Sequence, residues 1–364
     1  MLVNISTVSP PYKSLQSNTI KELKNRIGEN EKILRIIDAV ADNSEIDTRY
    51  FVVPDASGLK AENFYSTNAN YHMPDTSTRM SEYEKWAKKL SIQSVKNLFS
   101  ENRIDPQSIN RIITVSCTGF FAPGLDYHLI ESLNLPLDVK KTNIGFMGCA
   151  ASVNAFNCIL ESIESSKEKE NNVLMLTVEL CSLHLHTEAT LDNIISNTIF
   201  ADGCASAFFT NDKQYENLSK LKLIKTFSIL FENCKDVMGW KVGNFGFEMM
   251  LSHKLPKIIS EVAVPKLKEV LANDGIKITE IKHWVLHPGG KAILDALQKG
   301  LNLSDELMYP SREILKNFGN MSSSTILFIL REILDTKTIN KNDLCCVVAF
   351  GPGLVMEIAL FKGI

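Results

Sequence analysis

The chain contains the stretch Gly145-Phe146-Met147-Gly148-Cys149-Ala150-Ala151-Ser152, in which a cysteine follows a glycine and precedes small residues. A second stretch, Phe318-Gly319-Asn320-Met321-Ser322-Ser323, repeats this pattern with asparagine in place of cysteine. Each stretch opens a run whose apolar residues have helical spacing. Two matching turns of this kind predict that the chain holds two copies of one α/β unit.

The residues upstream of the two turns support this duplication. One apolar run, typical of a strand, ends at Cys117, and another ends at His287. Cys117 precedes Cys149 by 32 residues, and His287 precedes Asn320 by 33 residues. A thiol in one copy and a histidine with an asparagine in the other predict a single site built between two halves.

The order of apolar and amphipathic segments predicts an α/β fold whose sheets are covered by helices. Polar residues around 210–220 separate the two copies, so we expect an N-terminal half over 1–215 and a C-terminal half over 216–364. Residues 1 to about 60 are interpreted as a lead-in to the first half, and the polar run 165–172 is expected to end the helix after Cys149. The expected helices span 19–29, 79–101, 256–274, 290–300 and 321–334, and the expected strands span 111–117, 173–179, 205–209, 283–287, 344–350 and 355–361.

The overall composition limits the classes of function. The chain has 364 residues, of which 45% are hydrophobic, and its 39 basic and 42 acidic residues give a net charge of −3. This balance argues against a nucleic-acid binder or another general polyanion binder. No apolar run has the length of a membrane span, and the N-terminus lacks the pattern of a secretory signal. We therefore expect a cytoplasmic protein with a full hydrophobic core.

The eight cysteines form no C-x-x-C pair, and most of them lie in apolar runs. In a chain of this size they are expected to be reduced and buried, which agrees with a cytoplasmic location. The histidines of His184-Leu185-His186 suggest a metal pair, but cysteine or acidic ligands at suitable spacing are missing around them. We expect no metal site.

The three matched residues suit one kind of chemistry. Cys149 would lie at the start of a helix, where the helix dipole stabilises a thiolate and lowers the pKa of the thiol. His287 could pair with this thiolate and then donate a hydrogen bond to an oxyanion, and the amide of Asn320 adds an uncharged donor. Taken singly, each residue also fits a structural role, for example the asparagine as a turn or cap. Their matched positions favour a site that stabilises an enolate or a thioester oxyanion.

Short motifs surround these residues in both halves. The second half carries His287-Pro288-Gly289-Gly290, Gly319-Asn320-Met321-Ser322-Ser323 and Phe350-Gly351-Pro352-Gly353, and the first half carries Cys117-Thr118-Gly119, Pro123-Gly124-Leu125-Asp126, Gly148-Cys149-Ala150-Ala151 and Phe200-Ala201-Asp202-Gly203.

Together these motifs resemble the type III polyketide synthases, the chalcone-synthase-like branch of the thiolase-fold condensing enzymes. The resemblance extends from Arg49 to Phe361 with the motifs in the expected order. Ketoacyl synthases of the III type share the cysteine, histidine and asparagine, but they usually carry His-Gln-Ala-Asn where this chain has His-Pro-Gly-Gly. The resemblance implies a thiolase-like fold with duplicated αβαβα layered halves, and a homodimer.

The resemblance also implies catalytic roles. Cys149 would be acylated by a starter acyl-CoA and would carry the growing chain. His287 and Asn320 would bind the thioester carbonyl of malonyl-CoA, so that loss of CO2 leaves a stabilised enolate. The expected partners are therefore acyl-CoA and malonyl-CoA as substrates, and no cofactor is expected.

Further residues take their expected roles from the same resemblance. Phe200 resembles the gate between the CoA tunnel and the cavity, and Gly351-Pro352-Gly353 resembles the loop that shapes the cyclisation chamber. Arg49 resembles a basic residue near the CoA phosphates. Outside the family context, these would be a core aromatic, a rigid turn and a solvated surface arginine. The expected pocket residues are Cys117, Cys181, His184, Trp240, Met249 and Ser322.

Some positions depart from the plant members of the family. Cys117, Cys181 and His184 stand where plant chalcone synthases usually have threonine, which gives the chain a likeness to the bacterial branch. An alkylresorcinol, alkylpyrone or tetrahydroxynaphthalene product fits this likeness. Ala122 replaces a methionine that in many relatives reaches into the partner subunit.

The sequence thus predicts decarboxylative condensation of malonyl-CoA units onto an acyl-CoA starter, followed by cyclisation to an aromatic or pyrone product. Three alternatives stay open. They are a β-ketoacyl thioester synthase that makes one extension, a hydrolase with the Cys, His and Asn order of papain-like enzymes, and a dimeric acyl-CoA binder without catalysis. The duplicated halves argue against the hydrolase, and the intact triad argues against the binder.

Overall fold

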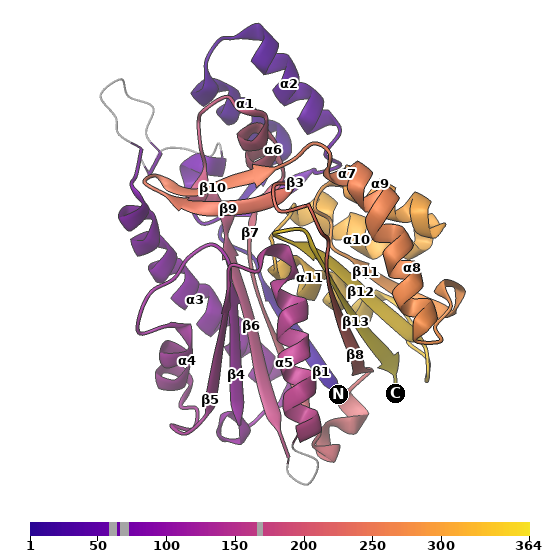
Figure 1. Cartoon of the computed structure of the whole chain (residues 1–364). Coiled ribbons are helices and arrows are strands. Elements are labelled where there is room, and N and C mark those ends of the chain that lie inside the picture. The colour runs from indigo at the N-terminus through magenta and orange to yellow at the C-terminus, as the bar shows by residue number, and fades with distance from the viewer. Residues whose placement is uncertain (58–63, 66–72, 166–169) are drawn as a thin grey trace.

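The computed structural model describes residues 1–57, 64–65, 73–165 and 170–364, and Figure 1 shows its elements. Part of the polar run 165–172 lies outside these residues. The strands are β1 Leu2–Val8, β2 Tyr12–Leu15, β3 Thr48–Phe51, β4 Arg111–Ser116, β5 Lys140–Gly145, β6 Asn172–Leu180, β7 Asp202–Thr210, β8 Leu221–Leu230, β9 Met238–Gly243, β10 Gly246–Leu251, β11 Ile281–Leu286, β12 Leu344–Gly351 and β13 Val355–Gly363. The helices are α1 Gln16–Ile27, α2 Glu31–Asp42, α3 Thr76–Asn102, α4 Leu125–Leu133, α5 Ala151–Ser165, α6 Leu191–Ile199, α7 Leu255–Ile258, α8 Val264–Asn273, α9 Lys291–Leu301, α10 Asp305–Phe318 and α11 Ser324–Thr336.

The main sheet has nine strands in the order β11-β12-β13-β8-β1-β7-β6-β4-β5. It consists of two half-sheets that meet between β1 and β8, where Leu2 pairs with Leu221. In the first half, β4 is parallel to β5 and β6, while β7 is antiparallel to β6 and β1. In the second half, β11 is parallel to β12, while β13 is antiparallel to β12 and β8. The order β1-β7-β6-β4 of one half is therefore repeated as β8-β13-β12-β11 in the other, as the matched motifs predict, and β5 is an additional edge strand of the first half.

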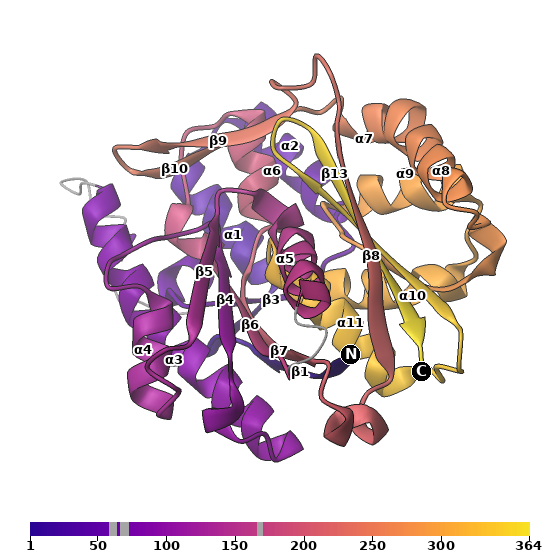
Figure 2. The same ribbon diagram turned by 60° about the horizontal axis from the view of Figure 1, so that its bottom comes forward.

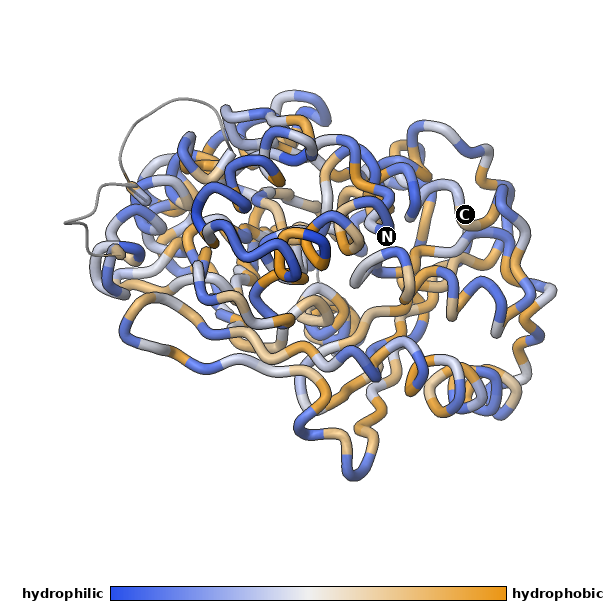
Figure 3. The backbone as a smooth tube through the Cα atoms, turned by 90° about the horizontal axis from the view of Figure 1, so that it is seen from above, coloured by the Kyte–Doolittle hydropathy of each residue, from blue (hydrophilic) through white to orange (hydrophobic). Residues whose placement is uncertain are grey.

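Five layers result from this repeat. Helices α5 and α11 lie between the two half-sheets, and their apolar residues share one hydrophobic core with both (Figure 2). Helices α3 and α4 cover the outer face of the first half-sheet, and α8, α9 and α10 cover the outer face of the second. Figure 3 shows hydrophilic and hydrophobic residues interspersed along the helical turns, as expected for helices with one buried face. The predicted thiolase-like αβαβα arrangement is confirmed.

The chain crosses from the first half-sheet to the second between Thr210 and Leu221. The polar residues expected at the seam lie in this connection. The division into halves at 215 and 216 stays a prediction.

The expected role of the first 60 residues is wrong in part. Residues Leu2–Val8 form β1, a buried strand at the centre of the main sheet, and not a lead-in. Its side chains are buried on both faces because the α5 and α11 layer covers one face and α3 covers the other. Residues 12–51 form an accessory unit, in which α1 and α2 pack on α6.

Strands β9 and β10 form a hairpin that is a separate two-stranded sheet. In Figure 1 the hairpin runs across the upper part of the molecule, below α1 and α2, beside α6 and above the strands of the first half-sheet. A two-stranded ribbon is marginally stable by itself, so its position depends on contacts with the rest of the chain.

Among the described residues, no helix combines the length and apolar character that crossing a bilayer requires.

The aromatic side chain of Phe156 on α5 ties the two half-sheets together. Its ring centroid lies 5.7 Å from that of Phe209 on β7 and 5.3 Å from that of Phe361 on β13. We expect Phe156→Ala to lower the free energy of unfolding by about 3–5 kcal/mol, because it leaves a cavity at this junction. Urea unfolding measures the change, with Leu137→Ala as the control, since Leu137 is 89% exposed. Equal losses for both variants would contradict the role of Phe156.

Candidate active site

Cys149 lies in a single 3-10 turn, Gly148–Ala150, between the end of β5 and the start of α5. The tight connection uses left-handed backbone at Phe146 (φ 59°) and Gly148 (φ 63°). A Cβ atom at Gly148 would lie 2.9 Å from Cδ of Pro352, so only glycine fits there. The loop around Pro352 therefore packs directly against the turn that holds the thiol.

Asn320 approaches this thiol from the second half. It follows Gly319, which has φ 71°, and its backbone pairs with Phe200 of the first half. Its side-chain Oδ1 accepts a hydrogen bond of 2.8 Å from the backbone N–H of Ser322 and lies 4.0 Å from Sγ of Cys149. Because Oδ1 is bound in this way, the amide nitrogen is the end of the side chain that can donate to a ligand.

His287 follows β11 and is 2% exposed. Its Nε2 lies 2.9 Å from the carbonyl oxygen of Ser322. A carbonyl oxygen only accepts, so Nε2 carries the proton, and Nδ1 is the acceptor nitrogen of the neutral ring. Ser322 thus joins His287 and Asn320, because its carbonyl binds the imidazole and its N–H binds the amide.

The expected lowering of the thiol pKa at Cys149 is wrong in this structure. Desolvation raises the pKa of Cys149 to about 12, more than its hydrogen bonds to Ser322 and Asn320 lower it. Burial also lowers the pKa of His287 to about 4. Both groups are therefore neutral near pH 7 in the free protein. A thiolate requires proton transfer from the sulfur, and the position at a helix start does not supply it.

A cavity extends from Cys149 toward the β9–β10 hairpin. Phe200, the predicted gate, and Asn320 line it beside the thiol. Predicted residues along its wall are Cys117, Cys181, His184, Trp240, Met249 and Ser322.

One prediction for the surroundings needs correction, and another stays a prediction. Gly351-Pro352-Gly353 packs against the turn that holds Cys149, since a Cβ atom at Gly351 would lie 2.8 Å from the carbonyl oxygen of Met147, and its role in shaping the chamber stays a prediction. Arg49 is 2% exposed, and its guanidinium donates to the carbonyl oxygens of Asn197 (2.8 Å) and Phe200 (2.6 Å). This arginine braces the segment that carries Phe200, and its burial argues against contact with CoA phosphates.

The sequence reasoning missed several cavity residues on the hairpin. Phe247 and Leu251 flank the predicted Met249 at alternate positions of β10, and Met238 lies opposite Leu251 on β9. Large apolar residues at the alternate positions 247, 249 and 251 are the signal that could have found Phe247 and Leu251.

Glu179 is a further missed residue, buried at the end of β6. Its Oε2 accepts hydrogen bonds from the backbone N–H of Cys117 (3.0 Å) and from the hydroxyl of Thr118 (2.9 Å), and its Oε1 accepts one from the hydroxyl of Ser323. The carboxyl group thus connects the strand before the thiol with the segment after Asn320. The sequence signal that could have indicated Glu179 is an acidic residue at the end of an apolar run.

The histidine pair of His184-Leu185-His186 binds protein atoms. His184 Nε2 lies 2.7 Å from the carbonyl oxygen of Thr118, and His186 Nε2 lies 2.9 Å from that of Phe247. Within the described ranges, no group of three or more histidine, cysteine or acidic side chains could hold a metal ion.

Two family models together match the chain over 19–364. Residues 19–239 match the model of the FAE1/type III polyketide synthase-like proteins, and residues 222–364 match the C-terminal domain of chalcone and stilbene synthases.

Individual proteins are similar over the same range. The chain is 28% identical to the alpha-pyrone synthesis polyketide synthase-like Pks18 of Mycobacterium tuberculosis, over 95% of this chain and 86% of that protein. It is also 28% identical to polyketide synthase 37 of Dictyostelium discoideum, but it spans 12% of the length of that protein. The crystal structure of PKS-I from the brown alga Ectocarpus siliculosus superposes with a TM-score of 0.90, at 28% identity, over 100% of this chain and 98% of the other.

Glu179 gives the stability of the protein a pH dependence. Burial raises the pKa of this carboxyl from 4.5 to about 7. Between these values the folded chain binds a proton that the unfolded chain has lost, so stability falls as the pH rises, by at most about 1.4 kcal/mol per pH unit. We expect Glu179→Gln to remove this slope. Urea unfolding of both proteins at about pH 5, 6 and 7 measures it, because the other titrating groups cancel in the difference. If the free energy of unfolding has the same pH dependence in both proteins, the raised pKa of Glu179 is contradicted.

Proposed function

The chain belongs to the type III polyketide synthase family, and we propose that it condenses malonyl-CoA units onto an acyl-CoA starter and cyclises the product to an aromatic or a pyrone. The observation that supports this most directly is the meeting of Cys149 and Asn320 at one cavity, with 4.0 Å between Sγ and Oδ1. The two residues come from opposite halves of the fold. His287 is joined to both through Ser322 and Asn320.

In the proposed first step, the sulfur of Cys149 attacks the carbonyl carbon of the starter thioester. The C–S bond to CoA breaks, the CoA thiolate leaves, and an acyl-enzyme forms. The thiol proton must leave the sulfur before or during the attack, because the free thiol is a weak nucleophile. The neutral imidazole of His287 is the proposed acceptor through its Nδ1.

In the second step, the C–C bond between the malonyl carboxylate and the adjacent carbon breaks. CO2 leaves, and the electron pair forms an enolate of the CoA thioester. The enolate carbon then attacks the acyl carbonyl on Cys149, and the thiolate of Cys149 departs. The amide nitrogen of Asn320 and the Nε2–H of His287 are the proposed donors to the enolate oxygen. For His287, this bond replaces its present one to the carbonyl of Ser322.

Every step moves electron pairs among carbon, sulfur and oxygen atoms, so the proposed reaction requires no redox cofactor. CoA thioesters enter as substrates. The similarity to a protein named for alpha-pyrone synthesis favours a pyrone product over a product of a single extension. Family membership argues against the cysteine hydrolase.

We also propose that the chain is a homodimer. Strand β5 lies at the edge of the main sheet and is largely exposed. Beside it lie the exposed side chains of Phe120 (55%), Phe146 (43%) and Met147 (37%). An apolar surface next to an open sheet edge is typical of a protein–protein contact. The cytoplasmic location stays a prediction.

The experiment that tests the function is incubation with labelled malonyl-CoA and a panel of acyl-CoA starters. Mass spectrometry then identifies the products and the peptide that contains Cys149. A cyclised product together with an acylated Cys149 would support the proposal and reveal the starter. Thioester hydrolysis without condensation would contradict it.

Replacing the thiol separates the two proposed steps. We expect Cys149→Ala to abolish acyl transfer and condensation, while decarboxylation of malonyl-CoA remains measurable because the enolate donors are intact. Release of labelled CO2 and formation of product are followed in the same assay. A Cys149→Ala protein that still forms condensed product would show that the nucleophile lies elsewhere.

Asn320→Ala tests the enolate donor. We expect the rate of malonyl-CoA decarboxylation to fall by about 10²–10³, as for the loss of one oxyanion-hole donor. Acylation of Cys149 by the starter serves as the internal control, because a folded protein still forms the acyl-enzyme. An unchanged rate of decarboxylation would reduce Asn320 to a structural residue that accepts from Ser322.

A further inference from the structure

The β9–β10 hairpin forms one wall of the cavity although it is separate from the main sheet. Its inner face presents Phe247 and Met249 to the cavity. Its outer face carries Lys241 and Glu248, which form an ion pair of 3.4 Å. One face of the hairpin therefore lines the cavity, so the position of the hairpin affects the shape of the cavity.

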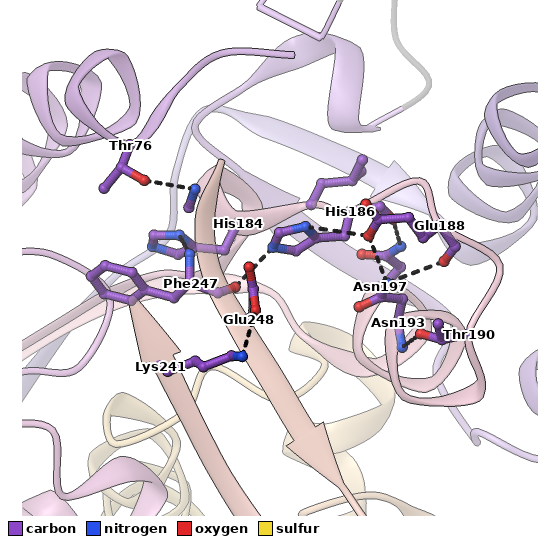
Figure 4. Close-up of polar contacts among 12 residues, drawn as sticks. Thr76, His184, His186, Glu188, Thr190, Asn193, Asn197, Lys241, Phe247 and Glu248 are labelled. Atoms are coloured by element: carbon purple, nitrogen blue, oxygen red, sulfur yellow. Dashed lines mark hydrogen bonds and ion pairs between the residues drawn. The ribbon is translucent and has the colours of Figure 1, made fainter. Parts of the chain in front are cut away.

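Two histidine side chains hold the backbone of Phe247. The N–H of Phe247 donates to Nδ1 of His184 over 3.0 Å, and its carbonyl oxygen accepts from Nε2 of His186 over 2.9 Å (Figure 4). In a sheet, a neighbouring strand satisfies such groups. Here two side chains of His184-Leu185-His186 take the place of that strand.

His184 also fixes the side chain of Phe247. The two rings are stacked, with centroids 4.2 Å apart and an angle of 12° between the planes. The ring of His184 is fixed in turn by its Nε2, which donates to the carbonyl oxygen of Thr118. Accepting at Nδ1 while donating at Nε2 requires a neutral ring, and burial lowers the pKa of His184 to about 3.

Further hydrogen bonds connect His186 with the segment that carries Phe200, the predicted gate. The amide of Asn197 donates to the carbonyl oxygen of His186 over 2.7 Å. The carbonyl oxygen of Asn197 accepts from Arg49, which also binds the carbonyl oxygen of Phe200. At the hairpin turn, the N–H of Gly246 donates to the hydroxyl of Thr76 over 2.9 Å (Figure 4).

Beyond Phe247, the next rings belong to surface residues. The ring centroid of Phe120, which is 55% exposed, lies 6.3 Å from that of Phe247 in a stacked arrangement. The ring centroid of Phe146, which is 43% exposed, lies 5.6 Å away. The ring of Phe247 thus packs on the cavity-lining His184 and lies near the rings of Phe120 and Phe146, which belong to the surface proposed as the dimer contact.

We propose that Phe247 is a specificity-determining residue whose ring limits how far the growing chain extends, and that His184 and His186 are positioning residues that hold it in place. This inference rests on the proposed condensing function. A longer intermediate would overlap with the ring, so extension beyond this length is disfavoured by steric repulsion.

Phe247→Ala tests whether the ring of Phe247 limits the length of the growing chain. We expect the ratio of products with one or more additional malonyl units to the wild-type product to rise by roughly tenfold, since a few carbon atoms in an apolar pocket discriminate by at least this factor. Phe245→Ala is the matched control, because Phe245 is an aromatic residue of the same hairpin, is 50% exposed, and lies outside the set of cavity-lining residues. The control should keep the wild-type ratio. An unchanged ratio for Phe247→Ala would overturn the proposal.

His186 is tested by two variants. His186→Leu removes the donor to the carbonyl of Phe247, and we expect the product ratio to shift in the same direction as for Phe247→Ala. His186→Gln keeps a donor of similar reach and should restore the wild-type ratio. A shift that glutamine fails to restore would overturn the positioning role, as would a leucine variant with the wild-type ratio. Because the readout is the ratio among the products formed, partial loss of folded protein does not change it.

The wild-type protein distinguishes this inference from the proposed function. If wild-type protein forms no condensed product from any starter, the proposed function fails. If wild-type protein condenses malonyl units and all hairpin variants give the same product ratio, only the inference about Phe247 fails.

Discussion

The active site depends on one buried carboxyl group that both halves of the fold share. Glu179 takes hydrogen bonds from Cys117 and Thr118 of the first half and from Ser323 of the second. Burial disfavours the charged carboxylate and raises the pKa of Glu179, and the hydrogen bonds from these donors offset part of this cost. Glu179 thereby holds the end of β4 and the segment after Asn320 together, which fixes the position of Asn320 relative to the thiol of Cys149. The two halves of the duplicated fold are joined at this point.

Much of the fold and the chemistry could be predicted from the sequence because they leave periodic or repeated signals. The matched turns at Cys149 and Asn320 indicate the duplication, and the apolar runs before them indicate the parallel strands. The cavity residues Trp240 and Met249 were predicted from a family resemblance and lie where it implies.

The remaining features depend on distant contacts that local patterns do not encode. Strand β1 looks like an ordinary lead-in, and it becomes a central strand only because β7 and β8 lie on either side of it. Arg49 looks like a surface charge until the carbonyls of Asn197 and Phe200 are placed around it. The pKa of Cys149 differs from the expectation for the same reason: the helix start is visible in the sequence, whereas the desolvation that raises the pKa is a property of the assembled cavity.

The central position of β1 also has a consequence for how the protein is made. Residues Leu2–Val8 find their main partner in β7, with Val8 opposite Cys204 and Leu2 opposite Phe209. During synthesis, this apolar strand has no partner edge until the ribosome has completed β7, and contacts between such distant residues form slowly. An unpaired strand of this kind can associate with other chains. In the nascent chain this strand therefore stays without its main partner until β7 is made, about 200 residues after β1.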